Sequence, residues 1–551
     1  MTGTPRSNAK KNILPAKACF ILLAAALVTA FADSFYVPEA DPSIIWLRWI
    51  VYFMLLLFIT SILKFLQKSP GFLSGIPSGL RESFTDSRKN KLRLAACFFL
   101  IYAIWAIVHY PGTCGTDTLN QIKDLITGTE PIPFGWIDGQ EPISVLMNDH
   151  HPVFDTLIFT TFYKIGDLAG KPNLGMFLYV LIQISLLSYL FADIVCSLDR
   201  YGAPFAIQLL SAAFFCMPFM AYFSITMIKD TLFSMVFILY FGKYLELFFA
   251  LKQQIKPKAS DWIRLICFSI LIALTNKKGI YIAAVSNLLL IPGTKNKKCL
   301  KQVMLSFLLP ILIVSVFIRH LLFPLFNIYP GGRQEMLGIT FQQVVGTWLE
   351  FPDDFTPKDI EALNAVLTIT PEQYQPVYEP YSSDMIKGKY NFYATSEDIF
   401  NYLKVWLKIG IRHPLAYLKI MAKVNGGAFS PSKTINIYSG IPYIKGVRLS
   451  QHEKLTGARN FFRNFYDWVK NVPGITLLFR DAFYLFWIPV ILISILIASK
   501  GSLRITAFAP ILINILFLMV GPVSWTRYGL CQLYTLPLQF SILYRNHRGI
   551  K

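Results

Sequence analysis

The sequence predicts an all-α membrane protein that crosses the bilayer many times. Of its 551 residues, 54% are hydrophobic and only 15% are charged, whereas soluble proteins carry about 25% charged residues. Apolar runs of roughly 20 residues, the length of a membrane-crossing helix, recur along the chain. Lysines and arginines gather in short loops between these runs, as they do in cytoplasmic loops of membrane proteins. This pattern excludes a soluble enzyme, a secreted disulfide scaffold and a disordered regulator.

We expect about twelve transmembrane helices. The basic N-terminal segment leads into the first of them without a convincing signal-peptide cleavage site. The expected spans are 18–37, 44–66, 93–110, 174–196, 204–225, 231–250, 262–275, 279–291, 303–322, 476–498, 505–520 and 529–543. Segment 152–165 is short for a crossing and is interpreted as a shallow or re-entrant helix. If it does cross, a later pair such as 262–291 forms one bent span.

Loop charge gives the expected orientation. With the N-terminus inside, the basic loops and the C-terminus fall on the cytoplasmic side of the cell membrane. The loop 111–151 belongs outside because it holds one lysine and six acids, namely Asp117, Asp124, Glu130, Asp138, Glu141 and Asp149. The expected parts are N-terminal helices with a cytoplasmic loop (1–92), a transmembrane core (93–322), an extracytoplasmic domain of mixed helical and irregular structure (323–475) and C-terminal transmembrane helices (476–551).

Net charge and cysteine content limit the kinds of molecule and metal that the protein is expected to bind. The formal net charge of +20 fits this topology and attraction to anionic membrane lipids better than binding of nucleic acid, for which we expect no role. The eight cysteines show no CxxC or Cys/His zinc spacing, so neither a disulfide framework nor a structural metal is indicated. Within the outer domain, segment 401–424 has amphipathic helical spacing. It either packs on its own domain or lies on the membrane surface.

The first outer loop carries the most informative polar residues. It opens with YPGTCGTDTLNQ, where Pro111, Gly112 and Gly115 force a turn. That turn would hold Asp117 near the membrane surface as a general base, or as a ligand for a divalent metal such as Mg²⁺ or Mn²⁺. The loop closes with NDHHP, which contains Asp149, His150 and His151. The competing interpretations are that Asp117 caps the following helix and that the histidines merely pack the loop.

Cations at the outer ends of the spans form the second group of candidates. Topology does not require positive charge there, yet four outer links carry it: Lys229, Lys277 and Lys278, Arg333, and Arg527. Converging cations are suited to binding phosphate. The alternative is that each cation pairs with a nearby acid or reaches toward lipid headgroups. Residues beside them that would support such a site are Asp230, Glu335, Gln342 and Tyr528.

Together these residues match a defined chemistry. A polyprenyl-phosphate sugar presents its charged group at the membrane interface. Transfer of the sugar needs cations for the departing phosphate and a carboxylate for the acceptor hydroxyl.

The motifs GTDTLNQ, NDHHP, MIKD, RQEMLGITFQQ and WTRY together resemble the GT-C glycosyltransferases, in an uncharacterised bacterial branch. The likeness extends from about residue 95 to the end of the chain. It implies a GT-C-like helix bundle that transfers a sugar from a polyprenyl-phosphate donor to a glycan, lipid or protein acceptor outside the membrane, for cell-envelope synthesis. By this resemblance Asp117 is the loop acid, Asp149, His150 and His151 form the closing motif, and Arg527 contacts the donor phosphate.

Two other classes of protein that act on lipid-linked glycans remain as alternative interpretations of this sequence. One is a transporter or flippase for a lipid-linked glycan, and the other is a factor for polymerisation or assembly of such a glycan. Transporters usually show internal repeats and ionisable groups near the bilayer midplane. Here no repeat is visible and the ionisable residues gather at the outer ends of the spans, which favours the enzyme.

Overall fold

A computed structural model gives the arrangement of the chain. It describes residues 14–38, 40–68, 78–127, 146–294, 297–329, 331–499 and 502–544. Glu130, Asp138 and Glu141 of the predicted acidic loop lie outside these residues, as does the basic C-terminal end from Arg545.

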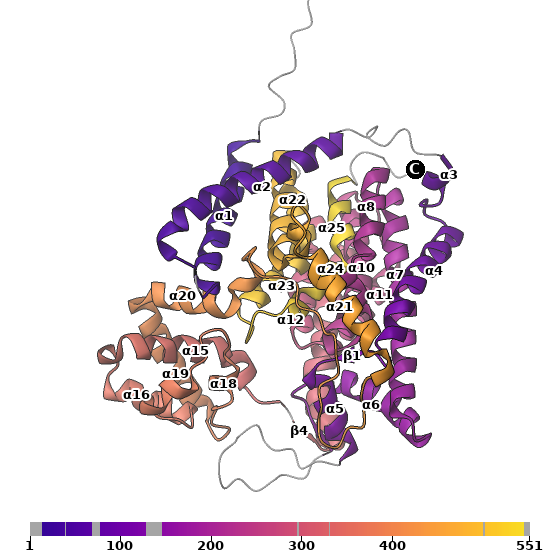
Figure 1. Cartoon of the computed structure of the whole chain (residues 1–551). Coiled ribbons are helices and arrows are strands. Elements are labelled where there is room, and N and C mark those ends of the chain that lie inside the picture. The colour runs from indigo at the N-terminus through magenta and orange to yellow at the C-terminus, as the bar shows by residue number, and fades with distance from the viewer. Residues whose placement is uncertain are drawn as a thin grey trace, which may run out of the picture.

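Long apolar helices build the main body, as the composition predicts. Six helices in the described residues are long and apolar enough to cross a membrane. They are α1 (Ala16–Tyr36), α2 (Ile45–Lys68), α4 (Arg88–Val108), α7 (Pro172–Arg200), α10 (Lys229–Lys252) and the run Lys297–Leu325, which joins α13 (Lys297–Ile311) to α14 (Phe323–Leu325). In Figure 1, α4, α7 and α10 stand side by side, while α1 and α2 lie apart at the opposite edge.

The remaining predicted spans are bent, broken or short. The pair α8 (Phe205–Phe215) and α9 (Pro218–Ser224) is bent by 60°, and it makes a seventh span if it is counted as one. The other helices of the bundle are α3 (Ser78–Glu82), α5 (Thr116–Ile126), α6 (Val153–Leu168), α11 (Ala259–Thr275), α12 (Lys278–Leu288), α22 (Ile488–Ala498), α23 (Ala509–Met519), α24 (Leu530–Tyr534) and α25 (Leu536–Tyr544). The all-α membrane architecture is therefore confirmed, whereas the twelve long spans are not.

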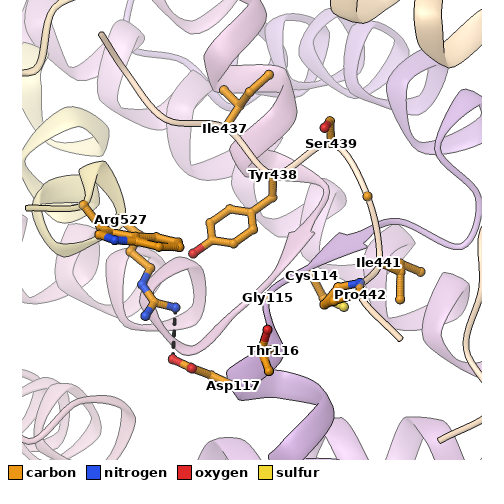
Figure 2. Close-up of a pocket in the computed structure, with 12 residues that line it drawn as sticks. Cys114, Gly115, Thr116, Asp117, Ile437, Tyr438, Ser439, Ile441, Pro442 and Arg527 are labelled. Atoms are coloured by element: carbon orange, nitrogen blue, oxygen red, sulfur yellow. Dashed lines mark ion pairs between the residues drawn. The ribbon is translucent and has the colours of Figure 1, made fainter. Parts of the chain in front are cut away.

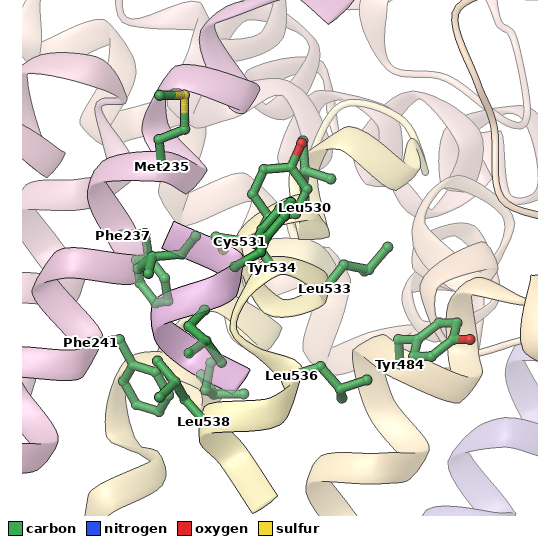
Figure 3. Packing of buried hydrophobic residues seen from close by; sticks show 14 of the residues in the cluster. Met235, Phe237, Phe241, Tyr484, Leu530, Cys531, Leu533, Tyr534, Leu536 and Leu538 are labelled. Atoms are coloured by element: carbon green, nitrogen blue, oxygen red, sulfur yellow. The ribbon is translucent and has the colours of Figure 1, made fainter. Parts of the chain in front are cut away.

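Interruptions in the C-terminal part explain much of this difference. The predicted span 476–498 is divided by an extended residue at Arg480 before a π-helical turn leads into α22. The predicted span 529–543 is divided between α24 and α25 at Thr535. The first of these two helices, α24, packs against α10. Figure 3 shows Leu538 beside Phe241 of α10, whereas Leu533 points toward Tyr484. This packing fixes the turn before α24 relative to α10.

A smaller helical lobe follows α14. It comprises α15 (Gln334–Glu350), α16 (Pro357–Val366), α17 (Tyr374–Val377), α18 (Asp384–Lys387), α19 (Ser396–Arg412) and α20 (Pro414–Asn425). The lobe has its own hydrophobic core, which runs from Leu337 to Tyr417. The amphipathic segment 401–424 thus buries one face in its own lobe, with Tyr402, Val405 and Ile409 in that core.

The later part of the predicted outer domain belongs to the main core instead. Phe429, Ile435, Val447 and Tyr466 pack with the transmembrane bundle. Residues 433–451, which we call the strap, have no regular secondary structure apart from one bridge at Thr434. The strap leads into α21 (Thr456–Val469).

Candidate functional site

Two very short parallel strand pairs bring distant loops together. β1 (Thr113–Cys114) pairs with β3 (Thr226–Met227), and β2 (Met147–Asn148) pairs with β4 (Ile328–Tyr329). The Thr118 hydroxyl also donates to the Met227 carbonyl at 2.7 Å. Helix α5 begins just after β1, and α10 begins just after β3. The pairing of the two strands therefore places the N-terminal ends of α5 and α10 next to each other.

Gly112 makes the approach of these two segments feasible. Its φ is +128°, a region in which residues with a side chain are strained. A Cβ at this position would lie 2.8 Å from Val180 Cγ2 and 3.0 Å from the Ile225 carbonyl oxygen. The glycine that the sequence places in the turn is therefore required both by conformation and by space.

Four charged side chains form a cluster where α5 and α10 begin. Asp117 Oδ2 lies 3.0 Å from Arg527 Nη1 and 3.9 Å from Lys229 Nζ. Arg527 Nε lies 3.7 Å from Asp230 Oδ2, and the Asn276 side chain donates to the other oxygen of Asp230 at 3.2 Å. The cluster thus holds two acids and two cations from three separate segments.

Asp117 does not cap α5, which was the competing interpretation of this residue. The N-cap position is Gly115, and Asp117 lies in the first turn of the helix. Asp230 occupies the corresponding turn of α10. Acids in the first turn are favoured by the helix dipole, whereas Lys229 at the start of α10 is disfavoured unless an acid lies nearby. Asp117 supplies that acid.

The cluster keeps Asp117 ionised. Burial by itself would raise the pKa of the Asp117 carboxyl, but the charges of Arg527 and Lys229 outweigh it and hold this pKa below its ordinary value. Burial by itself would lower the pKa of the Arg527 guanidinium. Tyr528, Asp117 and Asp230 outweigh this effect and hold the pKa well above its usual value. A carboxylate and a guanidinium therefore face each other at neutral pH.

The NDHHP motif lies next to this cluster. Lys229 Nζ is 2.9 Å from His151 Nδ1. Burial, and then the charge of Lys229, lowers the pKa of His151 well below its ordinary value, so its ring is neutral. Because an ammonium can only donate, His151 accepts through Nδ1 and carries its proton on Nε2. The histidine therefore positions the Lys229 ammonium that faces Asp117.

His150 and Asp149 point to other partners. His150 Nδ1 lies 3.6 Å from Glu335, which in turn is 3.1 Å from Lys387. Lys277 lies 3.3 Å from the Asp149 carboxylate and also donates to the Asp149 carbonyl oxygen. Burial raises the pKa of Asp149 and lowers that of His150 to about 4. These residues form a second polar layer that links the motif to the lobe.

A pocket opens beside the pair formed by Asp117 and Arg527 (Figure 2). Its volume is about 380 Å³, and one wall is the strap between Ile437 and Pro442. The Arg527 guanidinium lies over the rings of Trp525 and Tyr528, 5.0 and 5.1 Å from their centroids. The Tyr438 ring projects from the strap toward Arg527. Its buried hydroxyl has no hydrogen-bond partner among the described residues. The pocket therefore offers a carboxylate, a guanidinium, a phenol and aromatic faces.

A buried polar clamp holds the two aromatic walls together. The Thr526 hydroxyl donates to Asp481, 2.8 and 2.9 Å from its two oxygens, and accepts the Asn436 backbone N–H at 2.8 Å. Lys433 pairs with the same carboxylate at 2.7 Å. Because Thr526 lies between Trp525 and Arg527, this clamp joins the strap to the turn that carries the guanidinium.

Several predicted residues lie away from the pocket. The Arg333 side chain is exposed and donates to Ser396 of the lobe at 3.1 Å. Gln342 donates to the Glu379 carbonyl at 2.6 Å inside the lobe. Lys278 donates to the Tyr528 carbonyl at 2.6 Å and lies over Phe233, with no acidic partner in the described part of the chain. The structure therefore does not bring Arg333 and Gln342 to the cluster, whereas Lys278 borders it.

Three residues near the cluster were not singled out from the sequence. Tyr438 and Trp525 line the pocket. Asp155 in α6 is fully buried, and both of its carboxylate oxygens lack a hydrogen-bond partner among the described residues. Burial raises the pKa of Asp155 well above its ordinary value. Asp155 could have been found from the sequence, because it is an acid inside the apolar segment PVFDTLIFTTF. Tyr438 could not, because no sequence pattern distinguishes a single tyrosine in an irregular segment.

The donor set does not fit a divalent metal. Asp117, the proposed ligand, already faces two cations, and Asp230 faces Arg527 and Asn276. In the residues that the structure describes, no group of three or more His, Cys, Asp or Glu side chains is arranged to hold a metal ion.

Comparison with protein families adds one finding. The family model named DUF6020, a family of unknown function, matches residues 140–549, which is most of the chain. The chain belongs to this family. The match includes the NDHHP motif, Lys229, the strap and Arg527, and it begins after Asp117. No curated protein and no solved structure matches the chain.

Proposed function

We propose that the protein is a membrane glycosyltransferase of GT-C type, which uses a polyprenyl-phosphate-linked sugar at the outer face of the cell membrane. The observation that carries the proposal is the convergence of Asp117, Arg527 and the unpartnered hydroxyl of Tyr438 on one pocket. A carboxylate held in its ionised form can accept a proton, although the cations that lower its pKa also make it a weak base until a bound phosphate shares them. A guanidinium with five N–H donors can keep its contact with Asp117 and still bind phosphate.

In the proposed reaction, the acceptor hydroxyl gives its proton to Asp117 as its oxygen attacks C1 of the sugar. The bond from C1 to the phosphate oxygen breaks, and the polyprenyl phosphate leaves with the electron pair. Arg527 and Lys229 stabilise the charge that develops on that phosphate, and Lys278 adds a cation at the edge. The faces of Trp525 and Tyr438 suit the apolar side of a sugar ring.

The starts of α5 and α10 give a second reason to expect an anion here. Both helices direct the positive ends of their dipoles toward the cluster, and such ends favour negative charge. In the protein alone Asp117 and Asp230 occupy these positions. A phosphate would share Arg527 and Lys229 with them, and this sharing would leave Asp117 less tightly paired and more basic.

The test is sugar transfer by the purified full chain in lipid vesicles that contain synthetic polyprenyl-phosphate sugars. With an envelope glycan fraction as acceptor, we expect labelled product and release of polyprenyl phosphate. Asp117→Asn should lower transfer about a hundredfold, or ~3 kcal/mol, with lipid binding retained. Asp193→Asn is the control. Asp193 pairs at 2.8 Å with Lys91, which lies at the start of α4, whereas Asp117 follows the end of that helix. Equal transfer by both variants would contradict the role of Asp117.

A transporter or flippase for a lipid-linked glycan is the second candidate. The bent pair α8–α9, which leads directly into β3 and Lys229, favours it, because broken helices often form transporter substrate sites. The same vesicles separate the two functions. A flippase moves the labelled donor between leaflets with its glycosyl bond intact, whereas the enzyme cleaves that bond.

A further inference from the structure

Helix α21 has an apolar face that is only half covered by protein. Phe462, Tyr466 and Val469 follow one another at helical spacing and pack on the bundle. Phe462 packs edge-on against Trp105 of α4, with ring centroids 4.5 Å apart, and Tyr466 is buried against Tyr222 and Phe479. These contacts fix both the position and the rotation of the helix.

The adjacent sector of the same helix carries three large exposed aromatic side chains. Phe461, Phe465 and Trp468 are separated by four and three positions, so they lie on one side of the helix. Their exposed fractions are 68%, 38% and 66%. Soluble surfaces rarely leave such a contiguous aromatic stripe uncovered, so the stripe indicates an interaction site.

The position of α21 indicates what covers this stripe. Trp105 and His109, which contact Phe462, lie at the C-terminal end of the long helix α4. Ile104 and Ile107 near that end are also exposed, by 52% and 59%. The aromatic stripe therefore begins where an exposed apolar face of a candidate span ends. In Figure 1, α21 runs obliquely across the bundle rather than parallel to the long helices.

The remaining face of α21 is polar and carries positive charge. Asn460, Arg463 and Asn464 are exposed. Arg463 lies 4.0 Å from Asp467, and Lys470, just after the last turn, lies 2.5 Å from the same carboxylate, so these three groups together carry one net positive charge. A helix with aromatic residues on one face and arginine on the other is typical of a helix that lies in the membrane interface. The cations complement the phosphates of anionic lipids.

We propose that α21 lies along the membrane surface, with Phe461, Phe465 and Trp468 among the lipids and Arg463 at the level of anionic headgroups. The Tyr466 hydroxyl donates to the Ile435 carbonyl of the strap at 2.8 Å. Through this bond the membrane surface supports the strap that walls the pocket. The proposal rests on the helix faces alone and holds whichever reaction the pocket carries out.

The test uses the full chain in vesicles of phosphatidylethanolamine and phosphatidylglycerol. Single nitroxide labels are placed at positions 461, 465 and 468, and at 460 and 464 as controls on the polar face, with the native cysteines replaced. We expect labels on the aromatic stripe to collide with oxygen severalfold more often than with a water-soluble nickel complex. The control labels should show the reverse order.

Two results would overturn the proposal. High nickel accessibility at 461, 465 and 468 would place the stripe in water. Spin–spin broadening between labels on different molecules would show that a second copy of the chain covers it.

A second measurement applies if the cysteine replacements prevent folding. In the natural chain, quenching of tryptophan fluorescence by brominated phosphatidylglycerol should decrease with Trp468→Phe. It should stay unchanged with Trp348→Phe, because Trp348 packs on Tyr374 inside the lobe. Equal quenching in the natural chain and in Trp468→Phe would contradict membrane contact of α21.

Discussion

Arg527 Nη1 lies 3.0 Å from Asp117 Oδ2, which joins the start of α5 to the turn just before α24. Arg527 also approaches Asp230 at the start of α10. One guanidinium therefore connects three segments that are far apart in the sequence, and its planar shape allows two acids to be addressed at once.

Replacement of Arg527 by lysine should damage the site although the charge is kept. A lysine has one ammonium group and cannot contact Asp117 and Asp230 in the way that a guanidinium does. We expect the proposed sugar transfer to fall about a hundredfold and the melting temperature to decrease. Arg333→Lys is the matched control, because Arg333 is exposed and contacts Ser396 instead. If the two variants lose activity equally, Arg527 has no special role.

Thr526→Val should loosen the strap without removing any charge. The valine cannot donate to Asp481 or accept the Asn436 N–H, and one lost buried partner costs about 1–3 kcal/mol. Hydrogen–deuterium exchange should accelerate at the amide of Asn436 and in neighbouring strap peptides. Thr526→Ser keeps the hydroxyl and should restore slow exchange. Fast exchange in the serine variant would argue against the clamp.

Gly112→Ala should destabilise the protein much more than Gly170→Ala. Both glycines have positive φ, +128° and +68°, but a Cβ meets Val180 and Ile225 at Gly112 and nothing within 4 Å at Gly170. We expect a loss of roughly 2–5 kcal/mol at Gly112, from backbone strain plus steric overlap, against roughly 1–2 kcal/mol at Gly170. Thermal unfolding in detergent measures both. Similar melting temperatures for the two variants would show that β1 and β3 can separate without loss.

Mild acid should destabilise the folded protein through the NDHHP motif. The pKa of His150 is lowered from 6.5 to about 4, and that of His151 lies well below 6.5. In this range the two histidines bind protons in the unfolded chain but not in the folded protein, so their contribution to the free energy of unfolding falls as pH decreases from 6.5 toward 4. The raised pKa values of Asp149 and Asp155 act in the opposite direction, so the contribution of the histidines is measured as the difference between the natural chain and a variant without them. The limiting slope is ~1.4 kcal/mol per pH unit for each histidine. Asp117 contributes only below its ordinary value of 3.8, because its pKa is lowered.

Denaturation at several pH values measures this slope. The double variant His150→Asn, His151→Asn should show a flatter dependence between pH 6.5 and 4. An unchanged slope would mean that other groups control acid sensitivity.

The sequence identified Asp117, Lys229, Asp230 and Arg527 because charge is conspicuous at those ends of apolar runs that are predicted to face outward. It could not give the position of Arg333, since the same rule applies to any cation after a span. Only the fold shows that its side chain turns to Ser396 of the lobe. Tyr438 lies in a strap with no periodic pattern, so its distance from Arg527 depends entirely on tertiary contacts. The breaks at Arg480 and Thr535 were hidden because apolar composition continues across them.

The strap and the turn at Trp525–Arg527 come from the last third of the chain, whereas Asp117 comes from the first quarter. A nascent polypeptide still attached to the ribosome near residue 500 therefore possesses the acid and the strap but neither the Arg527 guanidinium nor the rings of Trp525 and Tyr528. The pocket is completed only when synthesis is almost finished, and for the same reason a fragment that lacks either Cys114–Asp117 or Trp525–Arg527 cannot form it.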